Sequence, residues 1–381
     1  MAGIYIHIPF CKQACYYCDF HFSTSLKKKS ELVQALVTEL QLRKDAFLNT
    51  QVNTIYFGGG TPSMLSLAEL EQIIKAVYAN YQVSNNPEIT LEANPDDLIS
   101  VQKNSKTIFE SYKNIGINRL SIGVQSFFES DLKLMNRAHN AAEAKIALEE
   151  ATKYFNNVSV DLIYGIPGAT NTQWLKNIET ALAFKVPHIS SYALTVEPKT
   201  ALSSFIEKGL ISPVDDALAE QQFQILVNVL TKQGFVNYEL SNFGKPDYFS
   251  QNNTAYWQGK HYLGIGPSAH SFNGKQRGWN VRNNTKYIKA LAANTLPIEW
   301  EVLSKTDQYN ERIMTGLRTI WGVSLNDIEK DFGAHYKDLL LKLAEKHIQN
   351  KLLYIQNNTL LVTKEGLFLS DGIASDLFLL N

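Results

Sequence analysis

The chain has 381 residues, of which 45 % are hydrophobic and 19 % are charged, and its formal net charge at pH 7 is −1. This length and composition fit a globular protein of two or three domains with a large buried core. The near-zero charge removes the electrostatic footprint of a nucleic-acid-binding protein, and no apolar run approaches the roughly 18 residues of a membrane span. The opening residues, MAGIYIHIPFC, lack the basic and apolar segments of a secretory signal, so we expect a cytoplasmic protein.

Six runs rich in β-branched and aromatic residues alternate with amphipathic stretches in the first half of the chain. The strand-like runs are Ile4–Ile8, Thr54–Phe57, Ile89–Ala93, Arg119–Val124, Val158–Tyr164 and Ile189–Leu194. The helical stretches include Glu31–Leu48, Leu67–Tyr81, Ala141–Phe155 and Thr172–Phe184. A capping-box pattern, Ser66 with Glu69, marks the start of the second of these helices. Strand–helix units in series predict a parallel sheet covered by helices, either doubly wound or barrel-like.

Residues that are unusual at strand ends favour the barrel. They are Cys11, Gly58–Gly60, Glu92, Asn94, Gln125 and Gly165–Gly168, together with Asp161 inside the fifth strand. In a barrel, residues from the ends of so many strands meet at one mouth, whereas in an open sheet they would lie in a row along one edge. We therefore predict an α/β fold that begins with a partial (β/α)6 barrel.

The pattern changes after about residue 205. A helical stretch, Asp215–Gln233, precedes the strand-like Val236–Leu240 and an aromatic, Asn- and Gly-rich segment from Tyr248 to Asn284. The end of the chain is mostly helical, and the runs Leu353–Ile355 and Leu360–Thr363 predict a hairpin. We predict a core barrel at 1–205, a barrel extension at 206–295, and a mixed α+β, winged-helix-like C-terminal domain at 296–381. The sequence leaves both a monomer and a homodimer open.

All three cysteines, Cys11, Cys15 and Cys18, lie within eight residues of one another. A disulfide-bonded secreted protein would carry an even number spread along the chain, so this grouping indicates one metal site in a reducing compartment. The spacing C-x3-C-x2-C covers three corners of a [4Fe–4S] cluster and leaves the fourth iron open. That iron suits the amino and carboxylate groups of S-adenosylmethionine, from which one electron releases a 5′-deoxyadenosyl radical. The alternative is a zinc site completed by His7 or His21, although the aromatic residues around the cysteines favour the cluster.

Further motifs follow the opening segment Tyr5–Cys11. They are Phe57–Ser63 (FGGGTPS), Glu92–Pro95 (EANP), Arg119–Ser126 (RLSIGVQS), Asn136–His139 (NRAH) and Asp161–Gly168 (DLIYGIPG). Together with the cysteines they resemble the radical-SAM group that contains the oxygen-independent coproporphyrinogen III oxidases (HemN) and the HemW family. The resemblance covers essentially the whole chain. It implies a radical-SAM barrel with a HemN-like cap, a [4Fe–4S] cluster, S-adenosylmethionine and an electron donor.

The resemblance also implies which residues contact S-adenosylmethionine. Glycines after a strand let the backbone approach a ligand, and in the family this loop holds the methionyl amino group. The implied residues are Tyr5, Gly58, Gly59, Gly60, Thr61, Glu92, Gln125, Arg137 and Asp161. Taken alone, Arg137 could be a solvated surface residue, Asp161 a strand-end cap, and Tyr5 part of the core.

Two functions follow from the family. One is a HemN-like enzyme that decarboxylates coproporphyrinogen III to protoporphyrinogen IX, and the other is a HemW-like chaperone that passes haem to an acceptor protein. HemN-type oxidases carry a fourth cysteine two residues after the third, where this chain has Phe20, and a longer segment before the first cysteine. Both differences favour HemW. A radical enzyme acting on another substrate is a third class, and no residue is assigned a catalytic role.

HemW proteins carry a haem-linked motif, His-Asn-x-x-Tyr-Trp, which Asn252–Trp257 matches except at its first position. Tyr256 and Trp257 could stack on a porphyrin, but asparagine is a poor axial ligand for iron. His261 and His270, the latter in the segment GIGPSAH, lie close enough in sequence to replace the histidine. Tyr256, Trp257 and His270 are therefore the haem-binding candidates, and the alternative for each histidine is an ordinary hydrogen-bonding role.

Overall fold

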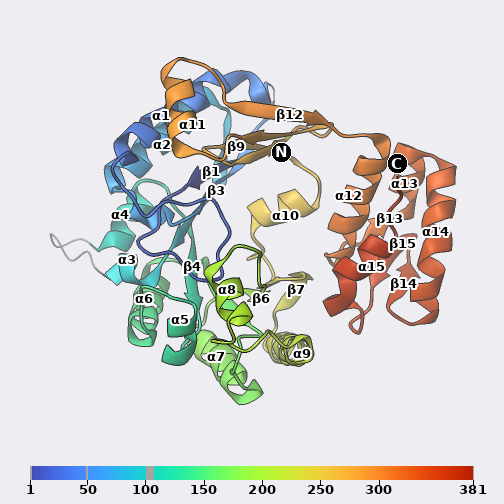
Figure 1. The fold of residues 1–381 in the computed structure, drawn as a ribbon. Helices are drawn as coiled ribbons and strands as arrows, with labels where there is room; N and C mark the ends of the chain where they lie inside the picture. The colour runs from blue at the N-terminus through green and yellow to red at the C-terminus, as the bar shows by residue number, and fades with distance from the viewer. Residues whose placement is uncertain (1, 49, 100–106, 381) are drawn as a thin grey trace.

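The computed structural model describes residues 2–48, 50–99 and 107–380, and its first half is a curved parallel sheet (Figure 1). The strands are β1 (Ala2–Ile8), β2 (Val52–Gly59), β3 (Val83–Ala93), β4 (Arg119–Gln125), β5 (Val158–Tyr164) and β6 (His188–Ala193). Each predicted run lies in one of them, apart from the last residue of the sixth run, and neighbours in chain order pair in parallel. The α/β prediction with six strand–helix units is therefore confirmed.

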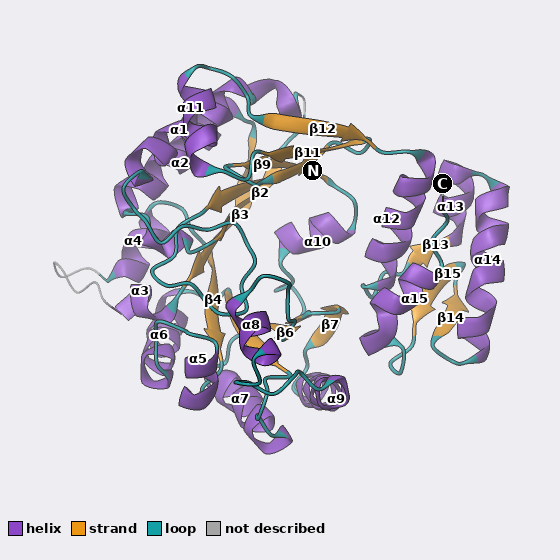
Figure 2. Ribbon diagram, in the orientation of Figure 1, coloured by secondary structure: helices purple, strands orange, loops and turns teal. Residues whose placement is uncertain are grey.

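Helices cover the outer face of this sheet, as Figure 2 shows. They are α1 (Lys29–Leu42), α2 (Leu67–Asn80), α3 (Pro95–Ile99), α4 (Ile108–Asn114), α5 (Glu129–Leu134), α6 (Ala141–Tyr154) and α7 (Asn171–Ala183), with short 3-10 turns η1 (Lys44–Phe47) and η2 (Pro62–Met64). The capping box before α2 is confirmed, since Ser66 and Glu69 each accept the other's backbone N–H. The first helix ends earlier than predicted and continues as η1, because apolar spacing alone does not separate an α-helix from a 3-10 helix.

Side chains along β1 alternate between the two faces of the sheet, so this strand contributes residues both to the core and to a site. Ile4, Ile6 and Ile8 are fully buried, on the face that the helices cover. Successive side chains in a strand point to opposite faces, so Tyr5 and His7 point to the concave side. The residues that face inward from the ends of the strands are therefore gathered at one mouth.

The second part of the chain extends the same sheet at both ends. The added strands are β7 (Val236–Glu239), β8 (Asn242–Gly244), β9 (His261–Ile265), β10 (His270–Phe272), β11 (Gln276–Asn280) and β12 (Ile298–Val302). β9 pairs with β1 in parallel, while β8 pairs with β6 in antiparallel fashion. The order β12-β11-β10-β9-β1-β2-β3-β4-β5-β6-β8-β7 leaves β12 and β7 as separate edges within the described residues, so the barrel is partial.

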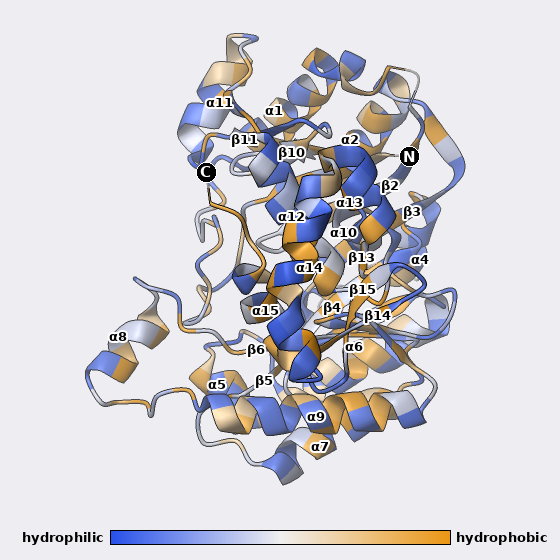
Figure 3. Ribbon diagram, turned by 90° about the vertical axis from the view of Figure 1, so that its right-hand side faces the viewer, coloured by the Kyte–Doolittle hydropathy of each residue, from blue (hydrophilic) through white to orange (hydrophobic). Residues whose placement is uncertain are grey.

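Four helices accompany these strands. They are α8 (Ala201–Glu207), α9 (Asp216–Lys232), α10 (Gln251–Trp257) and α11 (Asn284–Ala292). Hydrophobic and hydrophilic residues alternate along α9 (Figure 3), which buries Phe223, Leu226 and Leu230. In Figure 1, α10 lies inside the arc of the sheet. No described helix is long and apolar enough to cross a membrane.

The C-terminal part has its own core and a mixed α+β structure, as predicted. Its elements are α12 (Lys305–Leu317), β13 (Val323–Ser324), α13 (Leu325–Phe332), α14 (Ala334–Gln349), β14 (Leu353–Gln356), β15 (Thr359–Val362), η3 (Leu367–Leu369) and α15 (Ser370–Asp376). The predicted hairpin is β14–β15, whose turn residues Asn357 and Asn358 have φ of 49° and 61°. β13 joins the hairpin in the order β13-β15-β14, so the hairpin belongs to a small three-stranded antiparallel sheet.

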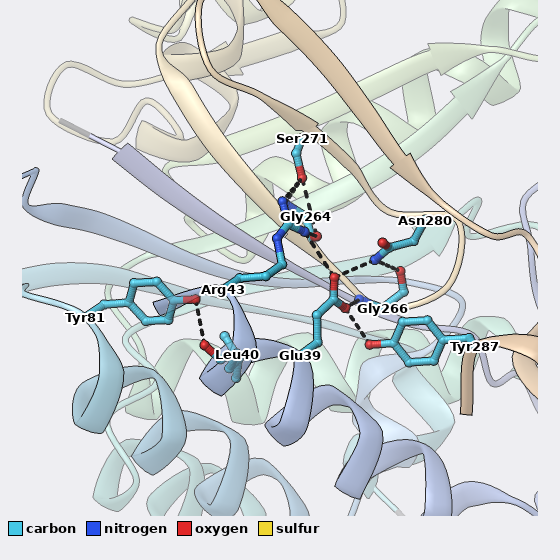
Figure 4. Close-up of polar contacts among 9 residues, drawn as sticks. All are labelled: Glu39, Leu40, Arg43, Tyr81, Gly264, Gly266, Ser271, Asn280 and Tyr287. Carbon is cyan, nitrogen blue, oxygen red and sulfur yellow. Dashed lines mark hydrogen bonds and ion pairs between the residues drawn. The ribbon is translucent and has the colours of Figure 1, made fainter. Parts of the chain in front are cut away.

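A buried polar cluster fixes the sheet extension to α1 (Figure 4). The Glu39 carboxylate, with 0 % exposure, accepts hydrogen bonds from the Gly266 N–H at 2.9 Å and the Tyr287 hydroxyl at 2.5 Å. The Arg43 guanidinium pairs with Glu39 at 3.0 Å and donates to the Gly264 carbonyl at 2.8 Å. Because buried charges are costly unless paired, this cluster holds the loop after β9 in one position.

Candidate functional site

A cavity of about 680 Å³ opens at the carboxyl ends of the strands and is lined by all three cysteines. We term it the cysteine cavity. Seven of the predicted cofactor-contacting residues also line it: Gly59, Gly60, Thr61, Glu92, Gln125, Arg137 and Asp161. These residues meet in one cavity because the parallel strands of the barrel all have their carboxyl ends at the same mouth, as predicted.

The loop that carries the cysteines is closed at its base. The Cys11 N–H donates to the Ser23 carbonyl at 3.1 Å, and the Ser23 N–H donates to the Pro9 carbonyl at 2.8 Å. Burial raises the pKa of Cys11, and it raises the pKa of Cys18 to about 11. Without metal these two are therefore thiols, and iron binding would release their protons.

A single metal ion and a cubane cluster place different demands on the three thiols. Within residues 2–48, 50–99 and 107–380, no three His, Cys, Asp or Glu side chains are placed around one metal ion. A cubane does not require this, because each thiolate binds a different iron. The histidines of the zinc alternative have other partners, since His7 Nε2 lies 3.0 Å from the His21 carbonyl and His21 Nε2 lies 2.7 Å from Asn284 Oδ1.

A chain of polar contacts joins two of the cysteines. The Arg137 guanidinium lies 3.4 Å from Cys15 Sγ and donates to Asn94 Oδ1 at 2.7 Å. Asn94 donates to Thr61 Oγ1 at 3.3 Å, and that hydroxyl lies 3.6 Å from Cys11 Sγ. Arg137 is thus a half-buried residue of the site rather than a solvated surface residue. In the sequence Asn94 stands at a strand end and within the EANP motif, but no ligand contact was predicted for it.

Two carboxyl groups that line the cysteine cavity have raised pKa values. Desolvation raises the pKa of Glu92 to about 7, and the negative charge of Asp161 adds to the effect. Desolvation likewise raises the pKa of Asp161 to about 6, against the opposing charge of Arg119. Glu92 accepts hydrogen bonds from the Tyr56 hydroxyl at 2.7 Å and the Gly59 N–H at 3.2 Å. A cationic ligand would favour the ionised form of both groups.

The glycines at 58 and 60 are required by close contacts with neighbouring protein atoms. A Cβ on Gly60 would lie 2.7 Å from the Phe10 carbonyl oxygen and 3.0 Å from Cys11 Sγ. A Cβ on Gly58 would lie 2.8 Å from the Tyr5 ring, and Gly58 does not line the cavity. Glycine at 60 is therefore required for the cysteine loop to pack against β2.

Gln125 ends β4 in an unusual conformation, with φ of 67°. A left-handed backbone is costly for a residue with a Cβ, and such residues collect at functional sites. The turn directs the Gln125 side chain into the cysteine cavity.

A second cavity, of about 490 Å³, adjoins the first at the cysteine loop. It contains three predicted residues that the cysteine cavity lacks, Tyr5, Tyr256 and His270, and we term it the histidine cavity after His7, His21 and His270 in its wall. Tyr5 thus lies here rather than in the cysteine cavity. The two cavities share four lining residues: Asp19, Phe20, Gly59 and Glu92.

The remaining residues of the haem-linked motif lie elsewhere. Asn252 is 2 % exposed and lies 2.9 Å from the Thr54 hydroxyl, so it faces neither cavity. Trp257 packs under the Arg318 guanidinium, whose carbon lies 4.9 Å from the ring centre. His261 pairs with Ala2 at the amino end of β1, at the opposite end of β9 from the cavities. The structure therefore separates Tyr256 from Trp257, and His261 from His270.

The C-terminal part contributes residues that no motif marked. Arg318 and Asp371 line the cysteine cavity. Arg318 pairs with Asp371 at 2.6 Å and with the buried Glu239 at 3.2 Å. This contact joins the C-terminal part to the sheet and completes the wall of the cavity.

Known proteins resemble this chain along its whole length. The radical SAM superfamily model matches residues 5–181, and the HemN C-terminal domain model matches residues 303–369. A protein named heme chaperone HemW from Lactococcus lactis is 33 % identical over 97 % of this chain and 95 % of its own length. The chain belongs to the HemW family of radical-SAM proteins. The HemW of Bacillus subtilis is 31 % identical over 98 % of each protein.

The structure of coproporphyrinogen III oxidase (HemN) from Escherichia coli has the same fold. It matches with a TM-score of 0.84 over 99 % of this chain and 90 % of its own, at 23 % identity. The predicted family resemblance is thus confirmed. Radical-SAM membership implies a [4Fe–4S] cluster and S-adenosylmethionine, for which the cysteine cavity has a suitable set of thiols.

Proposed function

We propose that this chain is a haem chaperone that carries a [4Fe–4S] cluster, binds S-adenosylmethionine and passes haem to an acceptor protein. The observation that carries the proposal is the full-length similarity to proteins named heme chaperone HemW. Phe20, in place of the fourth cysteine of HemN-type oxidases, supports it. The alternative, an oxygen-independent coproporphyrinogen III oxidase, rests on the HemN likeness, which at 23 % identity is a likeness of fold.

In this proposal Cys11, Cys15 and Cys18 hold the cluster. When bound and reduced, the cluster supplies one electron to the sulfonium of S-adenosylmethionine. The residues proposed to hold S-adenosylmethionine are Gly59, Gly60, Thr61, Glu92, Gln125, Arg137 and Asp161, with Tyr5 and Gly58 supporting them from behind the wall.

The acidic and the basic residues of the cysteine cavity would bind different groups. Glu92 and Asp161 offer carboxylates to a ligand that carries a sulfonium and an ammonium group. Arg137, 3.4 Å from Cys15 Sγ, places positive charge beside the thiolates and stabilises them. Tyr17 and Phe20 line the same cavity and limit the access of water to the cluster.

We also propose the three-part division of the chain, with a change to its last boundary. The parts are a barrel at 1–205, an extension from 206, and a C-terminal domain ending at 381, of which residues 1 and 381 lie outside the described residues. β12 (Ile298–Val302) pairs with β11, so it belongs with the extension. A boundary near Leu303 therefore fits the sheet better than one at 296.

The proposal requires an electron donor for the cluster and a haem acceptor. It also places the chain in the cytoplasm, since the three thiols need a reducing compartment. A monomer and a homodimer are both compatible with it.

The test uses the anaerobically reconstituted, cluster-loaded chain. With S-adenosylmethionine, a reductant and coproporphyrinogen III, we expect no protoporphyrinogen IX, while HemN from Escherichia coli serves as the positive control. In a parallel titration we expect haem to saturate at one equivalent per chain and then to move to an apo-haemoprotein. Robust decarboxylation, or haem binding that does not saturate, would contradict the proposal.

A further inference from the structure

We propose that the histidine cavity is the haem site, with the His270 imidazole as the ligand of the iron and the Arg282 guanidinium as the partner of a propionate. This rests on the proposed haem-chaperone function and deepens it by giving the haem a place and a ligand. The family motif has its histidine at position 252, but in this chain that position is Asn252, which is buried against Thr54.

The walls of the cavity suit a flat, largely apolar ring. Tyr256 and Tyr262 lie with ring centres 4.5 Å apart at an angle of 67°, and Tyr5 stands on the adjacent strand. Phe20 lines the cavity with 68 % of its side chain exposed, which is unusual for a large apolar residue. Aromatic side chains that present ring faces and edges bind a macrocycle well. The volume of about 490 Å³ falls within the usual range of cofactor pockets.

Among the three histidines of the cavity, His270 is the one whose ring is available. His7 lies 3.2 Å from the Tyr5 hydroxyl through Nδ1 and 3.0 Å from the His21 carbonyl through Nε2. His21 is held by Asn284. In the described part of the chain, neither ring nitrogen of His270 has a hydrogen-bond partner.

The surroundings of His270 also favour a neutral imidazole. Desolvation lowers the pKa of His270, and the charge of Arg277 lowers it further. A neutral imidazole has a free electron pair for iron, which an imidazolium lacks.

The backbone that carries His270 is held in place before any ligand arrives. The loop begins at Gly264, which receives Arg43, and continues through Gly266, whose N–H donates to Glu39 (Figure 4). Ser271, the next residue after His270, accepts from Arg43 at 3.0 Å. A ligand that meets a preorganised donor loses less conformational entropy on binding.

Arg282 supplies a positive charge at the edge of the cavity. It donates to the backbone carbonyl of Asp19, immediately after Cys18, and forms no ion pair with a carboxylate of the described residues. Arginine binds carboxylates through two parallel hydrogen bonds, which suits a haem propionate. Because Arg282 touches the cysteine loop, haem in this cavity would lie against the loop that holds the cluster.

The test is a haem titration of the full, cluster-loaded chain, so that the cysteines are occupied and cannot ligate haem. It compares the wild type with His270→Ala and with His261→Ala, an exposed histidine of the same segment outside the cavity. We expect His270→Ala to shift the Soret band, to remove the high-spin electron paramagnetic resonance signal of the histidine-ligated ferric haem, and to weaken binding at least tenfold. Added imidazole should restore the signal, and His261→Ala should behave as the wild type.

Arg282→Gln is tested with haem and with haem dimethyl ester, which lacks the propionate charges. The wild type should prefer haem by about fivefold, and the variant should show no preference, because a partly exposed ion pair contributes that order of affinity. Saturable haem binding with an unchanged spectrum in His270→Ala would overturn the proposed site while leaving the chaperone function intact. A loss of the signal in His21→Ala alone would also overturn it. Non-saturable binding in the wild type would overturn both proposals.

Discussion

The cysteine cavity and the histidine cavity share one loop but are built in different ways. The cysteine cavity collects residues from the carboxyl ends of successive parallel strands, and those from β2 to β5 belong to short motifs. The histidine cavity joins β1 to α10, β9 and β10, which come some 250 residues later in the chain. Strand-end convergence follows from the barrel itself, whereas the second cavity depends on how the sheet is extended.

The chemistry of the two cavities differs in the same way. The cysteine cavity holds the charged groups of Arg137, Glu92 and Asp161 together with three thiols. The histidine cavity holds imidazoles and phenols beside Arg282 and the shared Asp19 and Glu92, and burial lowers the pKa of His7 to about 4. The first is suited to a charged ligand and a metal cluster, and the second to a large ring with a neutral donor. The experiments below ask whether the two can be disabled separately.

Removal of a cluster ligand should have the largest effect. Cys11→Ala should reduce the iron content from about four atoms per chain to less than one, since three thiolates are the minimum for this kind of site. Iron analysis after anaerobic reconstitution measures it. Phe20→Cys is the matched control, because Phe20 adjoins the cysteines and is no ligand in this account, so its iron content should stay at about four. A full cluster in Cys11→Ala would mean that the site is elsewhere.

Loss of Arg137 should weaken the cysteine cavity without affecting the histidine cavity. Arg137→Ala removes the contacts with Cys15 and Asn94, and we expect S-adenosylmethionine affinity to fall by roughly 10- to 100-fold. Isothermal titration of the cluster-loaded protein measures this affinity. Haem affinity should be unchanged, and Arg137→Lys should recover only part of the loss. Equal losses for both ligands would show that the cavities are not independent.

Binding of S-adenosylmethionine should depend on pH through Glu92. Its pKa of about 7 means that it is largely protonated at pH 6, and a cationic ligand requires the ionised form. Affinity should therefore rise by about tenfold from pH 6 to pH 8, and Glu92→Gln should remove that part of the slope. The stability of the ligand-free chain should change in the opposite direction. Because the folded-state pKa is raised, the contribution of Glu92 is complete below the unfolded pKa and is lost as the pH rises through about 7. A slope that persists in Glu92→Gln would assign the titration to another group.

The contact made by Arg318 should have a smaller effect, on stability. Arg318→Ala leaves Glu239, with a side chain 1 % exposed, without its cation, and we expect a loss of roughly 3 kcal/mol in the free energy of unfolding. Arg312→Ala is the control, since its pair with Asp331 is exposed on both sides and should contribute less than about 1 kcal/mol. Denaturant unfolding measures both. A similar loss in the two variants would show that the Arg318 contact is an ordinary surface pair.

The comparison of the cavities also shows what the sequence can reveal. Strand periodicity and strand-end residues were enough to predict the parallel sheet and most residues of the cysteine cavity. The reason is that the carboxyl ends of all the parallel strands lie at the same end of the barrel. The position of Tyr5 was not predictable, since β9 pairs with β1 and opens a second cavity on that side. No local pattern signals such a pairing between segments so far apart.

The histidine cavity shows the limits of a motif. Tyr256 and Trp257 are adjacent in sequence, yet one faces the cavity and the other packs on Arg318, because α10 turns its residues to different sides. Arg318 and Asp371 join the cysteine cavity through tertiary contacts made by the C-terminal part. Nothing in the sequence assigns Arg282 to a site, because its contact with the Asp19 carbonyl depends on the tertiary structure.

The central claim is that two adjoining cavities at the cysteine loop hold two different ligands at the same time. The most direct test is a haem titration of the cluster-loaded chain, carried out with and without saturating S-adenosylmethionine. If the claim is right, one equivalent of haem binds in both titrations, and S-adenosylmethionine remains bound at one equivalent when haem is saturating. If haem displaces S-adenosylmethionine in a competitive manner, the two ligands share one site and the claim is wrong.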